Sequence, residues 1–82
     1  MKQIIYFTAE WCSPCKTLSP IMDKVKTNSG LNINKINVDN NKELVMHYNV
    51  KSIPTVIILE DNIEVRRFTG VKSEIEILNM LK

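Results

Sequence analysis

The chain has 82 residues, of which 44% are hydrophobic and 24% charged, and its 11 basic and 9 acidic residues leave a formal net charge of +2. A chain of this length builds one small core without room for a second, substrate-binding domain, so we expect a single domain over residues 1–82. Because the two signs of charge are nearly balanced and spread along the sequence, nothing indicates a nucleic-acid surface or a membrane-binding patch.

The N-terminal segment is not expected to direct export. Residues 1–7 hold one positive charge and an apolar run too short for the core of a signal peptide, and they are needed as a strand. No apolar segment approaches the length of about 20 residues that a membrane-spanning helix requires. Two cysteines in a non-secreted setting indicate a redox-active or metal-binding pair rather than a disulfide-rich scaffold. We therefore expect a cytoplasmic protein.

The first predicted element is a strand over residues 3–8. This run is rich in β-branched and aromatic residues and is apolar at consecutive positions. Such a pattern is typical of a strand that is covered on both faces. We expect this strand near the centre of a sheet.

Both cysteines and the only tryptophan lie in residues 9–16, where the strand gives way to a helical pattern. Two cysteines at this spacing can close and reopen a small disulfide ring at the start of a helix, which makes a reversible two-electron switch. Pro14 suits the first helical turn. Free N–H groups and the helix dipole stabilise a thiolate at Cys12, so we expect Cys12 to be the nucleophile and the more buried Cys15 to be the resolving thiol.

A helix is predicted over residues 13–29. Pro20 predicts a bend rather than a break, because the apolar periodicity continues on both sides of it, and Gly30 suits a left-handed cap. The apolar residues at helical spacing are Leu18, Ile21, Met22 and Val25.

Two weaker elements follow. Residues 32–38 mix apolar residues with asparagines and a lysine, which favours a strand at the edge of the sheet. A short helix is predicted over residues 41–48, with Asn40 and Glu43 placed to cap it.

The C-terminal half contains two strands and a helix. Residues 55–59 form the strongest strand pattern in the chain, and the arginines in residues 63–69 indicate a partly exposed partner strand. A helix over residues 73–82 opens with Ser73 and Glu76 in a capping box. Its predicted apolar residues are Ile75, Leu78 and Leu81.

The elements thus follow the order βαβαββα. Two parallel strands joined by a right-handed helical crossover, then an antiparallel hairpin and a helix, predict an α/β domain. Its sheet is expected to be four-stranded, mixed and covered by helices on both faces.

The motif Trp11-Cys12-Ser13-Pro14-Cys15-Lys16 resembles the Trp-Cys-Gly-Pro-Cys-Lys signature of the thioredoxin family, with Ser13 in place of glycine. The likeness extends over nearly the whole chain and implies a thioredoxin-like fold with strand order 2-1-3-4. We expect the chain to lack the N-terminal strand and helix of full-length thioredoxin, which brings it closer in length to glutaredoxins. The further matching positions are Ala9, Glu10, Pro20, Lys35, Asp39, Ile53, Pro54, Thr55 and Gly70.

The resemblance implies a thiol-disulfide oxidoreductase that reduces protein disulfides through Cys12 and Cys15, without a cofactor, in electron transport and cell redox homeostasis. It implies a cis peptide bond before Pro54, beside the cysteines, which leaves the backbone of Ile53 able to pair with an extended substrate. The residues expected to tune the redox pair are Ser13, Pro14 and Lys35. An apolar platform for substrate is expected from Trp11, Ile53, Pro54, Gly70 and Val71.

One position departs from the family. Counting back from Trp11, the family's buried acid should stand at position 6, where this sequence has Tyr6. A phenol is a poor base at neutral pH. We expect Cys15 to rely on a water or on Lys35 for its proton, with slower turnover.

Three alternatives stay open. The pair could draw electrons from glutathione, as in glutaredoxins, but residues 52–55 and the lone Gly70 lack the family's Thr-Val-Pro loop and Gly-Gly turn, which favours a thioredoxin-reductase-like flavoprotein. The fold could also serve as a non-catalytic binding module. Metal binding is disfavoured, because one Cys-x-x-C supplies only half of a zinc site. The expected partners are disulfide-containing proteins, and the protein itself is expected to be a monomer.

Overall fold

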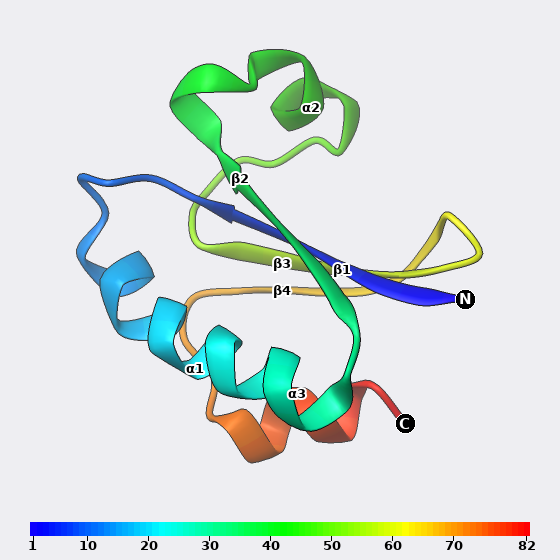
Figure 1. The fold of residues 1–82 in the computed structure, drawn as a ribbon. Coiled ribbons are helices and arrows are strands. Elements are labelled where there is room, and N and C mark those ends of the chain that lie inside the picture. The colour runs from blue at the N-terminus through cyan, green and yellow to red at the C-terminus, as the bar shows by residue number, and fades with distance from the viewer.

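The computed structural model describes residues 1–82 and has the predicted order of helices and strands. Figure 1 shows the sheet in the middle of the molecule with helices on both sides. One short turn of 3-10 helix, η1, was not predicted. The elements are β1 (Lys2–Thr8), α1 (Ser13–Ser29), β2 (Asn32–Asn37), η1 (Val38–Asn40), α2 (Lys42–His47), β3 (Thr55–Glu60), β4 (Ile63–Thr69) and α3 (Glu74–Met80).

The four strands form one mixed sheet in the order β2-β1-β3-β4, which confirms the predicted topology. The pair β1 and β2 is parallel, while β3 is antiparallel to both β1 and β4. The register places Tyr6 between Lys35 of β2 and Val56 of β3. The central position of β1 and the edge position of β2 agree with their sequence patterns.

Side chains of β1 alternate between two separate parts of the core, because successive residues of a strand point to opposite faces. Ile4 and Tyr6 face α1 and α3, whereas Ile5 and Phe7 face the side covered by α2 (Figure 1). The first part is closed by Leu18, Met22, Val25, Val56, Ile58, Phe68 and Ile77. The second contains Ile57 and Leu59.

Helix α1 has the ends that its sequence predicts. It begins after Cys12 and ends at Ser29, and the cap residue that follows is Gly30, whose φ of 70° lies in the left-handed region that glycine adopts easily. The Gly30 N–H donates to the Lys26 carbonyl at 3.0 Å. The helix is continuous through Pro20. Because Cys12 is its N-cap residue, the helix starts within the Cys12–Cys15 pair.

The cap predicted for the second helix was wrong. Helix α2 starts after Asn41 rather than Asn40, and no side chain caps it. The reason is η1, which takes up Val38–Asn40 and is itself capped by Asn37, whose side chain accepts from the Asp39 N–H at 2.8 Å.

Helix α3 confirms the Ser73 and Glu76 capping box but not the whole predicted apolar stripe. Ile75 is 72% exposed, whereas Ile77 is fully buried. Helix α3 packs against the core along one line, and Ile77 lies on that line together with Leu78 and Leu81. Ile75 faces away from it.

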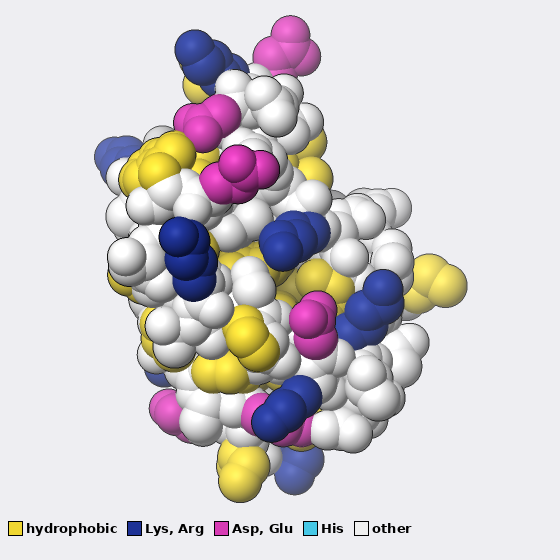
Figure 2. Space-filling model, turned by 60° about the vertical axis from the view of Figure 1, so that its left-hand side comes forward, with side chains coloured by type: hydrophobic (Ala, Val, Ile, Leu, Met, Phe, Trp, Pro, Cys, Tyr) yellow, Lys and Arg dark blue, Asp and Glu magenta, His cyan; other side chains and the backbone are white.

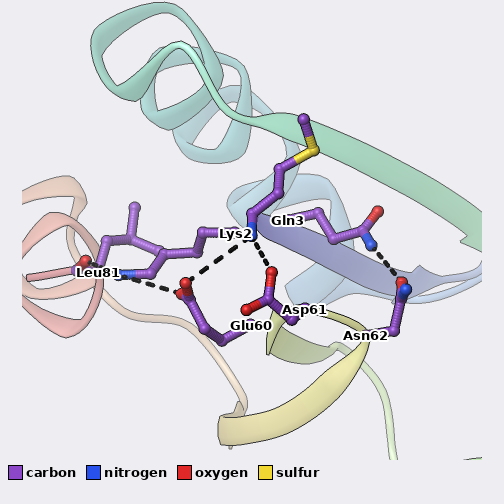
Figure 3. A network of polar contacts seen from close by, with 7 residues as sticks. Lys2, Gln3, Glu60, Asp61, Asn62 and Leu81 are labelled. Carbon is purple, nitrogen blue, oxygen red and sulfur yellow. Dashed lines mark hydrogen bonds and ion pairs between the residues drawn. The ribbon is translucent and has the colours of Figure 1, made fainter.

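Polar contacts tie the two chain ends to the β3–β4 turn (Figure 3). The N-terminal amine pairs with Asp61, and Lys2 bonds the Leu81 carbonyl and lies 3.9 Å from Glu60. The Gln3 amide donates to Asn62 at 2.9 Å. This network joins the start of β1, the turn and the end of α3, at the end of the sheet opposite the cysteines.

The surface carries mixed charge. On the face drawn in Figure 2, basic and acidic side chains are interspersed, and hydrophobic side chains form separate patches between them. None of the helices combines the length and the apolar character needed to cross a membrane.

Candidate active site

The two cysteines form a disulfide at the start of α1, with their Cα atoms 5.2 Å apart. Cys12 is the N-cap residue, and its backbone N–H donates to the Ala9 carbonyl at 3.3 Å. The Cys15 N–H donates to the Cys12 sulfur at 3.2 Å. The Cys12 sulfur therefore receives one of the free N–H groups of the first helical turn, at the positive end of the helix dipole.

Both sulfurs lie close to the surface without being openly exposed. Cys12 is 5% and Cys15 1% exposed, which agrees with the prediction that Cys15 is the more buried of the two. Ser13 and Pro14 between them are exposed. Pro14 lies in the first turn, where its missing N–H leaves no helical bond unmade. Cys12 is thus the more accessible of the two cysteines.

The loop before β3 packs beside the cysteines. Ile53 contacts the cluster of Ala9, Cys12 and Cys15, and the Ile53–Pro54 peptide bond is cis, as predicted. The backbone N–H and carbonyl of Ile53 make no hydrogen bond within the chain. They are therefore available to an extended peptide laid next to the disulfide.

Gly70 is linked to the same loop. Its N–H donates to the Pro54 carbonyl at 3.0 Å, and its φ of 82° lies in the left-handed region that side-chain-bearing residues adopt rarely. Pro54 is buried, whereas Val71 is 45% exposed. Pro54 and Gly70, which were predicted to belong to one platform, are thus joined by a backbone hydrogen bond.

Trp11 stands out from the surface, with 67% of its area exposed. Its indole Nε1–H donates to the Asp39 carboxylate at 2.9 Å. A groove of about 410 Å³ runs beside it toward the second part of the core. The groove is lined by Trp11, Val38, Val45, Val50, Lys51, Ser52 and Ile53.

The groove brings Trp11 and Ile53 together, as the predicted platform requires, but Pro54, Gly70 and Val71 do not line it. The valines from η1, α2 and the loop after α2 were missed. Their apolar character was readable, but their place beside Trp11 depends on how α2 packs on the sheet. The bond to Asp39 was also not foreseen, because Asp39 is 28 residues away along the chain.

A second hollow, of about 460 Å³, opens on the other side of Cys15. Lys35 reaches it from β2, so that Lys35 and Cys15 share one space, as a tuning role for this lysine requires. The hollow is lined by Thr8, Ala9, Glu10, Cys15, Lys16, Ser19, Lys35 and Asn37.

Tyr6 lies behind Cys15 and is 1% exposed. Its hydroxyl is 3.0 Å from the Cys15 carbonyl oxygen and 3.0 Å from Ser19 Oγ. Ser19 was not singled out from the sequence. The available signal was its position one helical turn after Cys15, on the side of α1 that faces β1.

The resolved pKa shifts lie elsewhere on the surface. A bond from Arg67 lowers the pKa of Glu64, and bonds from Ser73 lower the pKa of Glu76. No group of three or more His, Cys, Asp or Glu side chains is placed to hold a metal ion.

The sequence matches the Thioredoxin family model over residues 1–82. Among curated proteins, it is 37% identical to a thioredoxin of Chlamydia caviae over 79 residues, covering 95% of this chain and 78% of that protein. It is 35% identical to a thioredoxin of Mycobacterium bovis over 80 residues, covering 95% and 69% respectively.

Solved structures agree with this. Thioredoxin 1 of Thermosipho africanus superposes with a TM-score of 0.87 at 33% identity, covering 96% of this chain and 89% of that one. Thioredoxin-2, described as a component of malaria parasite protein secretion machinery, gives a TM-score of 0.94 at 29% identity, covering 99% and 81%.

Proposed function

The chain belongs to the thioredoxin family and is a dithiol thiol-disulfide oxidoreductase, and from this premise we propose that its 82 residues act as one domain that reduces protein disulfides. Cys12 is the nucleophile and Cys15 the resolving thiol. The observation that carries this assignment is the bond of 3.2 Å from the Cys15 N–H to the Cys12 sulfur, because a donor aimed at that atom favours its thiolate.

The reaction proceeds by two displacements. The Cys12 thiolate attacks one sulfur of a substrate disulfide, so that a Cys12–substrate bond forms and the other substrate sulfur leaves with the electron pair and takes up a proton. Cys15 then gives up its proton and attacks the Cys12 sulfur, and the second substrate sulfur leaves. The substrate gains two electrons and two protons, and the protein dithiol becomes a disulfide.

Substrate is held by the surface next to Cys12. An extended segment pairs with the backbone of Ile53, beside Pro54, while its side chains lie against Trp11. Gly70 and Val71 border the same approach, where the lack of a side chain at Gly70 leaves room for a second backbone. Ser13, Pro14 and Lys35 tune the redox pair, the first two from within the ring and Lys35 from the hollow beside Cys15.

A thioredoxin-reductase-like flavoprotein returns the electrons, and the protein works as a cytoplasmic monomer in electron transport and redox homeostasis. The likeness to bacterial thioredoxins supports this assignment over a glutathione-dependent one. The sequence at residues 52–55 and the single Gly70 support it too, because the glutaredoxin loop and Gly-Gly turn are missing.

The reduction potential of the Cys12–Cys15 pair tests the direction of the reaction. The protein is equilibrated in graded thiol and disulfide buffers, and the free thiols are trapped and counted. Reference values from other proteins are about −270 mV for thioredoxin, about −200 to −230 mV for glutaredoxins and about −120 mV for a strong oxidant. A value between the first two supports a reductase, whereas one near the last identifies an oxidant.

Two variants test the roles of the cysteines, and two reductants test the electron donor. Cys15→Ser should accumulate a mixed disulfide with substrate through Cys12, whereas Cys12→Ser should form none. The oxidised protein is offered NADPH with thioredoxin reductase, or NADPH with glutathione and glutathione reductase, and only the first should reduce it. If no reversible two-electron transition is found, the chain is a binding module and not a reductase.

A further inference from the structure

A pair of hydroxyl groups lies between the central strand and the helix that carries the disulfide. Tyr6 comes from β1 and Ser19 from α1, and the two oxygens are 3.0 Å apart. The Tyr6 hydroxyl is also 3.0 Å from the Cys15 carbonyl oxygen. Because the Tyr6 side chain is buried, water does not compete freely for these bonds.

The direction of both bonds follows from the number of protons. A carbonyl oxygen can only accept, so the single hydroxyl proton of Tyr6 is donated to Cys15. The Tyr6 oxygen must then accept from Ser19, whose own hydroxyl proton is therefore used as well. The chain of donors runs from Ser19 to Tyr6 to the Cys15 carbonyl. Each buried polar side-chain atom of the protein has a partner.

The Tyr6 hydroxyl acts on the backbone of Cys15 and makes no hydrogen bond to its sulfur. The other cysteine is tied to the residue that directly follows the same strand, since the Cys12 N–H donates to the Ala9 carbonyl at 3.3 Å. Strand β1 and the loop after it thus hold both cysteines. Apart from the Tyr6 bond, Cys15 is held by the first turn of α1 and by apolar packing against Ala9, Val38 and Ile53. First turns fray easily, and apolar packing is not directional, so the Tyr6 bond is the contact that fixes the position of this backbone.

We propose that Tyr6 and Ser19 form a hydroxyl clamp that positions Cys15 for bonding to Cys12, in place of an acid–base group. The proposal rests on the dithiol function given above and adds a positioning role for these two residues. Neither one touches the reacting sulfurs. The clamp and the Cys12–Cys15 bond order the same turn of α1, so each forms more completely when the other is present, and the clamp thereby raises the effective concentration of the Cys15 thiol at the Cys12 sulfur.

The readout is the equilibrium constant for ring closure. In a dithiothreitol buffer, the protein dithiol passes two electrons and two protons to one oxidised dithiothreitol, which leaves the protein disulfide and reduced dithiothreitol. A clamp made mainly in the disulfide form shifts this equilibrium toward the protein disulfide. A neutral hydrogen bond contributes about 1 kcal/mol, so its loss should lower the constant about fivefold.

This constant separates positioning from other roles. A general base speeds ring closure and ring opening alike and leaves the equilibrium constant unchanged. A purely structural role lowers the stability of the reduced and oxidised forms equally and also leaves it unchanged. Only a group that favours one redox form over the other shifts the constant.

The test variant is Tyr6→Phe, which removes the hydroxyl and keeps the ring in the core. Tyr48→Phe is the matched control, because the Tyr48 ring packs against Phe7 in the other part of the core, and the hydrogen bond that Arg67 makes to Tyr48 goes to the backbone carbonyl and not to the hydroxyl. Ser19→Ala removes one donor and leaves the bond to Cys15, so it should shift the constant in the same direction by less. Thermal unfolding of each variant in both redox forms checks that it folds.

A fall of about twofold or more in the constant for Tyr6→Phe, with Tyr48→Phe unchanged, supports the clamp. An unchanged constant overturns it, whether ring closure slows, which would make Tyr6 an acid–base group, or keeps its rate. An equal fall in the Tyr48→Phe control also overturns it. If the wild-type protein shows no reversible transition, the oxidoreductase function fails first, and that outcome is separate from an unchanged constant in the variant.

Discussion

Truncating Trp11 should impair the reduction of protein disulfides while sparing that of small disulfides. The indole is 67% exposed and shares a groove with Ile53, next to the cysteines. A polypeptide substrate can cover this ring, whereas a small disulfide can reach Cys12 without touching it. Trp11→Ala therefore removes a docking surface and leaves the reacting atoms in place.

The size of the effect follows from the exposed area. A tryptophan side chain buries roughly 150–250 Å² when it is fully covered. With 67% of it exposed, roughly 100–170 Å² remains for a substrate to cover. At about 25 cal/mol per Å², covering half of that area contributes about 1–2 kcal/mol. This corresponds to a loss of about 5- to 30-fold in kcat/KM for a protein substrate.

The assay compares insulin with hydroxyethyl disulfide, with dithiothreitol as the electron source for both. Ile63→Ala is the control, because Ile63 is 69% exposed but lies at the turn end of β4, opposite Glu60 and far from the cysteines. Asp39→Ala releases the indole N–H and should give a smaller loss than Trp11→Ala. An equal loss for both disulfides would refute the reasoning, and so would an unchanged rate with insulin.

Three further changes have expected outcomes. Tyr6→Asp should speed release of the reduced substrate in single-turnover kinetics, because the carboxylate restores a base that can take the Cys15 proton, and an unchanged rate would contradict this role. Loss of the buried ring should lower the free energy of unfolding by about 3–5 kcal/mol in denaturant titrations. Ser73→Ala should lower the melting temperature by about 4–8 °C in calorimetry, through loss of about 1 kcal/mol at the α3 cap, and leave the ring-closure constant unchanged. Arg67 lowers the pKa of Glu64, so this pair stabilises the fold above the ordinary glutamate pKa and stops doing so as the pH falls through the lowered value. The melting temperature of Glu64→Gln should then lie below wild type at neutral pH and converge with it in acid; a constant gap would contradict this assignment.

The local features of this protein were readable from its sequence. Cys12 at the start of α1, Gly30 at its end and the Ser73 capping box are set by residues within one helical turn of each other, so short-range chemistry decides them. The strands followed from their apolar patterns. The cis bond at Pro54 came from the family resemblance, because spacing alone predicts a trans bond.

Contacts between distant residues were decided by the tertiary structure. Tyr6 reaches the Cys15 carbonyl and Ser19 because the rotation of α1 against β1 sets which side chains meet. Trp11 meets Asp39 because η1 follows β2 at the same end of the sheet. Strand register and helix rotation depend on packing summed over the whole core, and no short stretch of sequence contains that sum. The sequence by itself therefore determined the dithiol and its place at a helix start, and the fold decided which side chains surround it.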